Sequence, residues 1–162
     1  MDLSAHDIDF IRWVLKDEVK SVYATGSSSS ENLREAGVQD NATMVMTFTK
    51  GTVVTLTMSR SACYGYDQRC EIFGSEGLAT VGNEFSNSSL LADSQGVHQS
   101  KLKHSFPQRF NQAFSSELDA FADTILLGTD WPVSPEDCIA VQKVADAAKE
   151  SNKLNQVVHI ES

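Results

Sequence analysis

The sequence predicts an α+β fold in which helices cover one face of an open, mainly antiparallel β-sheet of about six strands. A helical pattern opens the chain, alternating apolar and polar residues fill its middle, and two helical patterns close it. Strands that follow one another through tight turns pair antiparallel, and such a sheet needs one face covered. We expect residues 1–162 to form one domain, because a chain of this length buries roughly 70% of its unfolded surface.

The first expected elements are a helix and a strand. Apolar residues recur every three to four positions over residues 5–16, which is typical of an amphipathic helix. Alternation over residues 19–24 predicts a strand. The polar stretch 27–40, which is interrupted next to glycines, predicts a loop.

Three hairpins are expected in the middle of the chain. The clearest joins residues 42–48 to residues 52–59 through Lys50-Gly51, because apolar and polar residues alternate on both sides of that turn. The other two are predicted over residues 68–81 and 89–103. The polar face of the first hairpin is compatible with a homo-oligomer formed through the sheet, because its threonines tolerate either water or a partner surface: Thr43, Thr47, Thr49, Thr55 and Thr57.

Two helices and a short strand are expected to close the chain. Regularly spaced phenylalanines predict one helix over residues 107–127, ended by Gly128. Ser134 is expected to cap the next helix, with Asp137 at the capping-box position in place of the usual Glu. That helix should run to about residue 149, and a final strand is predicted over residues 156–160.

The acidic composition narrows the range of partners. The net charge is −9 and the sequence pI is about 4.8, so the surface repels nucleic-acid phosphates and anionic lipids. No stretch approaches the ~18 uninterrupted apolar residues of a membrane span, and the N-terminus lacks the pattern of a secretory signal. The three cysteines have no zinc-site spacing and favour a reducing compartment. We expect a cytoplasmic protein that binds no nucleic acid, membrane or metal.

The start of the chain holds the first candidate site. Asp2 and His6 are four residues apart and can share one face of the first helical turn. A carboxylate beside an imidazole fixes its tautomer and raises its basicity, as a general base requires. Asp9 follows three residues after His6 and is expected to face the same pocket. The alternative is that these acidic residues only cap the helix and interact favourably with its dipole.

The sequence YGYDQR holds the second candidate site. Tyr64 and Tyr66 combine a flat aromatic surface with a hydroxyl, which suits a hydroxyl-rich ligand. Gly65 between them permits a sharp bend that aims both rings at one place. The alternative is an aromatic loop packed under the sheet, in which Asp67 pairs with a nearby arginine.

Three segments together resemble a known family: residues 2–10 (DLSAHDIDF), residues 59–77 (SRSACYGYDQRCEIFGSEG) and residues 132–137 (PVSPED). They are similar to the C-terminal domain of the glucose–fructose oxidoreductase, inositol dehydrogenase and MocA-like NAD(P)-dependent oxidoreductases, and inositol 2-dehydrogenase is the nearest in character. The resemblance implies a Rossmann domain that holds NAD or NADP. It also implies a following open sheet that binds a polyol or sugar and mediates oligomers.

The resemblance also implies roles for individual residues. The family's Asp-x-x-x-His falls on Asp2 and His6: the histidine takes the hydroxyl proton as hydride leaves the adjacent carbon, and the aspartate orients it. Asp9 and Tyr66 match positions that contact substrate hydroxyls, and Tyr64 is a further substrate-binding candidate. No residue of this chain is expected to bind cofactor or metal.

The cofactor half of the family pattern is missing from the sequence. No Gly-x-Gly occurs, so the glycine-rich phosphate turn of a dinucleotide fold cannot form, and the family's Lys-Pro has no counterpart. We therefore expect the N-terminal dinucleotide-binding domain to be absent. The chain is expected to be the C-terminal half of an oxidoreductase acting on a CH–OH group of a cyclitol or sugar, inactive alone. The alternative is a non-catalytic module for polyol binding or dimerisation.

Overall fold

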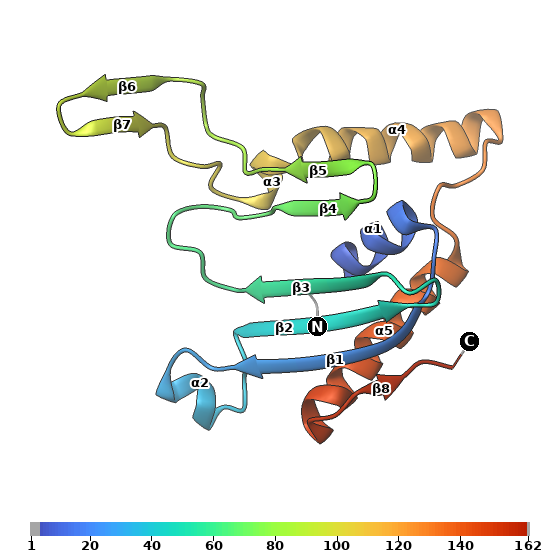
Figure 1. Ribbon diagram of the computed structural model, residues 1–162. Helices are drawn as coiled ribbons and strands as arrows, with labels where there is room; N and C mark the ends of the chain where they lie inside the picture. Colours follow the sequence, from blue (N-terminus) through green and yellow to red (C-terminus); the bar gives the residue numbers. More distant parts are fainter. Residues whose placement is uncertain (1–3, 162) are drawn as a thin grey trace. The chain divides into compact units, whose positions relative to one another are not determined.

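The computed structural model of this chain describes residues 4–161. The chain divides into two compact units, whose segments can be followed in Figure 1 by their colours along the sequence. The terminal unit combines both ends of the chain, Met1–Ser61 and Pro132–Ser162, and the middle unit is Ala62–Trp131. Both units contain helices and antiparallel strands, so the predicted α+β class is confirmed.

The terminal unit is built on a four-stranded antiparallel sheet with the order β3-β2-β1-β8 (Figure 1). Its strands are β1 (Val19–Ser27), β2 (Asn41–Phe48), β3 (Val53–Ser59) and β8 (Val158–His159). The β2–β3 hairpin turns at Lys50-Gly51 as predicted, and Gly51 takes a φ of 93° there, which side chains rarely adopt. Met44 of β2 lies opposite Leu56 of β3, so their apolar side chains share one face.

Two helices cover that face: α1 (Ala5–Leu15) and α5 (Pro135–Leu154). Helix α5 packs on β1, and α1 packs on α5. Alternation along β2 turns Met44, Met46 and Phe48 into the core, where all three are buried. Ile8 of α1 and Ala148 of α5 complete the same hydrophobic cluster, and neither is exposed to solvent.

A capping box fixes the start of α5. The Ser134 hydroxyl accepts a hydrogen bond from the Asp137 backbone N–H at 3.1 Å, and the Asp137 carboxylate accepts one from the Ser134 N–H at 3.1 Å. The prediction of a capping box with Asp at its third helical position is therefore confirmed. The helix runs to Leu154, five residues beyond the predicted end, and Asn155 closes it in the left-handed conformation.

The middle unit consists of two hairpins and two helices: β4 (Cys70–Gly74) with β5 (Gly77–Val81), β6 (Leu90–Asp93) with β7 (Gly96–Gln99), α3 (Phe106–Arg109) and α4 (Asn111–Leu127). Both hairpins were predicted. The helix expected over residues 107–127 is divided at Phe110, whose ring packs edge-on against Tyr66 at 5.9 Å. Periodicity does not reveal a contact between residues so far apart in sequence. No residue of Ala62–Trp131 is buried.

The predicted loop over residues 27–40 was wrong in one part, because α2 (Glu31–Glu35) forms there. Ser30 caps it by accepting a hydrogen bond from the Leu33 N–H at 3.4 Å, and Arg34 pairs with Glu31 at 3.3 Å. These local interactions stabilise a short helix that buries no residue and so shows no apolar stripe. Among residues 4–161, no helix has the length and apolarity needed to span a membrane.

Candidate functional site

A groove of about 600 Å³ lies on the terminal unit, beside α1 and the N-terminus of α5. Its wall mixes aromatic, acidic and basic side chains: His6, Asp9, Phe10, Arg12, Trp13, Lys16, Asp17, Glu18, Pro132, Val133 and Asp137. Two of these, His6 and Asp9, were predicted from the sequence as site residues. The groove is therefore the candidate site of this unit.

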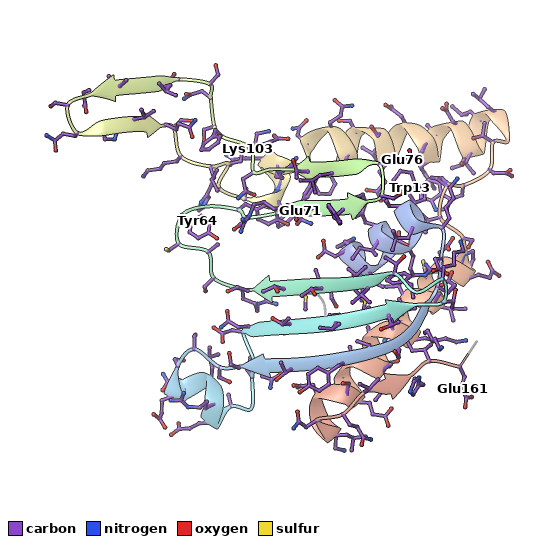
Figure 2. All side chains as sticks on the ribbon, in the orientation of Figure 1. Trp13, Tyr64, Glu71, Glu76, Lys103 and Glu161 are labelled. Atoms are coloured by element: carbon purple, nitrogen blue, oxygen red, sulfur yellow. The ribbon has the colours of Figure 1, made fainter. Side chains whose placement is uncertain are left out.

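Helix α1 presents one face to the groove. His6, Phe10 and Trp13 are spaced at i, i+4 and i+7, which places them on the same side of a helix, and Asp9 lies at i+3. Ile8 points the opposite way into the core. Figure 2 labels Trp13, which is 72% exposed. Asp2, the predicted orienting partner of His6, lies outside the residues that the structure describes.

Arg12 forms the centre of the groove's charge network. Its Nε and Nη2 donate to the two carboxylate oxygens of Glu18, both at 2.7 Å, in a bidentate ion pair. Its Nη1 and Nη2 lie 3.4 Å from the backbone oxygen and Oδ1 of Asp137. Nη1 also lies 3.5 Å from Oδ1 of Asp9. Although Arg12 is 7% exposed, the hydrogen bond to Glu18 raises the pKa of its guanidinium against the opposing effect of burial.

Hydrogen bonds also hold two further carboxylates that line the groove, those of Asp137 and Asp17. Those from Ser134 lower the pKa of Asp137, and the charge of Arg12 acts in the same direction. Burial acts to raise the pKa of Asp17, but hydrogen bonds from the Thr49 hydroxyl and the Lys50 N–H outweigh it and lower that pKa. Both carboxylates are thereby stabilised as anions.

The second predicted cluster forms a local network within the middle unit. The Tyr64 hydroxyl donates to Asp67, Arg69 donates to the same carboxylate from Nε at 2.7 Å, and Asn83 donates from Nδ2 at 2.7 Å. The hydrogen bond from Arg69 is the largest of the effects that lower the pKa of Asp67 to about 2. The hydrogen bond to Asp67 likewise raises the pKa of Tyr64. The pairing of Asp67 with a nearby arginine, one part of the alternative, is observed with Arg69, whereas Tyr64 is 58% exposed and so is not packed under a sheet.

Gly65 and Tyr66 pack this loop against the chain around residue 102. The Tyr66 N–H donates to the Lys103 carbonyl at 2.9 Å. Gly65 has a φ of 133°, and a Cβ at this position would lie 2.7 Å from the Cβ of Leu102. Glycine is therefore required here both by the backbone conformation and by the close approach.

The structure brings His6 and Asp9 to one groove and joins Tyr64 to Asp67 in one network. The two groups belong to different units. Sequence reasoning missed Arg12, Trp13 and Glu18 as groove residues. The spacing of Trp13 from His6 was a usable signal, whereas the contacts of Arg12 with Glu18 and with Asp137, 125 positions away, follow no helical spacing. No cluster of metal-binding side chains occurs among residues 4–161.

Comparison with known proteins places the chain in a family. Residues 1–80 match the sequence profile described as the GFO/IDH/MocA C-terminal domain. Myo-inositol 2-dehydrogenase of Thermotoga maritima is 34% identical over 99% of this chain. The chain carries a GFO/IDH/MocA C-terminal domain. Inositol 2-dehydrogenase of Rhizobium meliloti is 32% identical over 93% of the chain.

The fold of this GFO/IDH/MocA domain is also similar to parts of solved inositol dehydrogenase structures. The crystal structure of scyllo-inositol dehydrogenase from Lactobacillus casei, with bound NAD(H) and scyllo-inositol, aligns with a TM-score of 0.91 and 32% identity over 98% of the chain. The chain spans only about half the length of these proteins: 48% of the Thermotoga protein, 46% of the Rhizobium protein and 47% of the Lactobacillus structure.

The described residues of the terminal unit form no Rossmann-type dinucleotide site. The sheet of the terminal unit is antiparallel, so it lacks the strand, glycine-rich turn and helix that hold a pyrophosphate. The N-terminus of α5 carries Glu136 and Asp137, whose charges repel a phosphate where one would otherwise bind. The groove itself is lined by more carboxylates than cations.

Proposed function

We propose that this chain supplies the substrate-binding part of an NAD(P)-dependent oxidoreductase acting on a CH–OH group of a cyclitol or sugar. The observation that carries the proposal is the similarity to myo-inositol 2-dehydrogenase along 99% of the chain at 34% identity. The presence of His6 and Asp9 in the same groove supports it, because a proton acceptor and a hydroxyl-binding carboxylate must lie close together.

Each predicted residue has a defined role in this proposal. His6 accepts the proton of the reacting hydroxyl, and Asp2 orients the imidazole. Asp9 accepts hydrogen bonds from neighbouring hydroxyls, and Tyr66 contacts the substrate. The Tyr64 hydroxyl already donates to Asp67, so its role is to accept a hydrogen bond from a substrate hydroxyl through a lone pair.

The cofactor has a separate binding site in this proposal. Because the terminal unit has no Rossmann-type site, we propose that NAD or NADP binds to polypeptide outside these 162 residues. The 162-residue chain by itself is then expected to bind polyol without oxidising it, since no hydride acceptor is held against the reacting carbon. The three cysteines are free, which supports a reducing, cytoplasmic location.

Direct binding of cyclitols to the 162-residue chain tests this function. Ligand-observed NMR should show saturable binding of myo-inositol, and substitution of Asp9 by Ala should weaken it about tenfold, the effect of losing one hydrogen bond to a charged group. Glu150→Gln, an exposed carboxylate of α5, is the matched control and should leave the affinity unchanged. The proposal is refuted if the unsubstituted chain binds no cyclitol.

We also propose that the outer face of the terminal sheet pairs with a second copy of this chain. Val45 and Val53 are 38% and 63% exposed there, beside the threonines of β2 and β3. The Thr43 and Thr57 hydroxyl oxygens are 3.4 Å apart across the strands. Sedimentation should detect a dimer that Val45→Lys converts to monomer. A monomeric unsubstituted chain would argue against pairing and also against the alternative function as a dimerisation module.

A further inference from the structure

Asp9 lies three residues before Arg12 on α1, and its side chain is 39% exposed in the groove. We propose that Arg12 is a positioning residue, whose fixed guanidinium holds Asp9 toward the groove and compensates its charge while leaving its oxygens open to hydroxyl donors. This inference rests on the substrate-binding role proposed for Asp9. It adds a residue that touches no substrate and acts through its neighbour.

The geometry gives Arg12 a fixed position. The bidentate pair with Glu18 uses Nε and one Nη2 hydrogen, and the 3.4 Å contacts to Asp137 connect the guanidinium to the start of α5. Asp137 is itself held by the capping box with Ser134. The side chain of Arg12 is 7% exposed, whereas that of Asp9 is 39% exposed. A buried, anchored cation therefore faces an acid that solvent or a ligand can reach.

The contact between Arg12 and Asp9 attracts the carboxylate without occupying it. Nη1 lies 3.5 Å from Oδ1, beyond the usual length of a charged hydrogen bond, so the attraction is mainly electrostatic. A carboxylate held in this way keeps its lone pairs for donors such as ring hydroxyls. The position of Asp9 three residues before Arg12 brings both onto neighbouring parts of the α1 surface.

The charges around the groove explain why Asp9 needs this compensation. Asp9, Asp17, Glu18 and Asp137 line the groove with Arg12 and Lys16 as its cations. Without Arg12, Asp9, Glu18 and Asp137 would lose the cation that contacts all three, and their mutual repulsion would favour an Asp9 rotamer that points to solvent. A lysine cannot replace Arg12, because its ammonium lacks the planar fork of donors with which the guanidinium contacts three carboxylates.

The test follows the side chain of Asp9 directly in the 162-residue chain. Three-bond couplings measured by NMR report whether its χ1 angle occupies one rotamer or several. We expect one rotamer in the unsubstituted chain and averaging in Arg12→Gln. Glu150→Gln, an exposed carboxylate of α5, is the matched control and should leave the Asp9 rotamer single. Glu18→Gln weakens the bidentate anchor of Arg12 and should give partial averaging of the Asp9 rotamer. Arg12→Lys retains a charge near the site and should give intermediate averaging.

Myo-inositol binding supplies the second measurement. Arg12→Gln should weaken binding about tenfold, and to the same extent as Asp9→Ala, because both remove the same oriented acceptor. A single Asp9 rotamer in Arg12→Gln, or in Arg12→Lys if the Gln variant does not fold, overturns the inference whatever the polyol result. If the Asp9 rotamer averages in Arg12→Gln but neither the unsubstituted chain nor any variant binds polyol, the positioning role is upheld and the proposed substrate is refuted.

Discussion

The Asp67 network gives the most quantitative prediction. Substitution of Asp67 by Asn keeps the size of the side chain but removes the charge that Tyr64, Arg69 and Asn83 surround. The Asn amide would also present N–H groups to two existing donors. We therefore expect the segment around residues 64–83 to be less stable in Asp67→Asn at neutral pH.

The magnitude follows from the pKa of Asp67, which falls from 3.8 to about 2 in the folded state. Such a shift corresponds to about 2 kcal/mol of stabilisation of the anion. Arg69 is 67% exposed, so water screens part of that attraction, and we expect about 1–2 kcal/mol. Because the folded pKa is depressed, this stability is present above pH 3.8 and is lost as the pH falls through about 2.

Hydrogen exchange in the β4–β5 hairpin measures the stabilisation by the Asp67 carboxylate within the middle unit. A local measurement is needed because the two units need not unfold together. Protection factors at neutral pH should fall by about one order of magnitude in Asp67→Asn. The difference between the two proteins should shrink toward pH 2. Glu76→Gln, at the exposed β4–β5 turn labelled in Figure 2, is the control and should change neither quantity. Equal protection in Asp67→Asn and the unsubstituted chain would refute the reasoning.

Thermal unfolding should detect three further effects. Ser134→Ala removes the capping box of α5 and should lower the stability by about 1 kcal/mol, so an unchanged melting temperature would contradict the importance of this cap. Met46→Ala empties a fully buried core position and should cost about 2–5 kcal/mol, whereas a smaller loss would mean that the core collapses around the gap. Lys16 has a left-handed φ of 48°, so Lys16→Gly should raise the stability by about 0.5–1 kcal/mol. A lower stability would show that the contacts of the lysine side chain outweigh the strain of its backbone conformation.

Features that depend on nearby residues were predictable from the sequence. Alternation located β2 and β3, because β2 buries one face in the core and β3 turns a half-buried apolar face to the same core. Ser134 and Asp137 identified the start of α5, because a capping box involves residues only three apart. The short helix α2 was missed because it buries nothing, although Ser30 offered a cap signal.

Features that depend on distant residues were not predictable in the same way. The contact of Arg12 with Asp137 joins residues 125 positions apart, and the break at Phe110 accompanies its contact with Tyr66. The roles of His6, Asp9, Tyr64 and Tyr66 in substrate binding are still predictions.

The construction of the terminal unit from both ends of the chain has a practical consequence. One cut by a protease between residues 62 and 131 would produce two fragments, yet β8 would still pair with β1, and α5 would still share a core with β2. The nicked protein is therefore expected to remain assembled as a non-covalent complex. In topology, Ala62–Trp131 is an insertion between the two segments that together form the terminal unit.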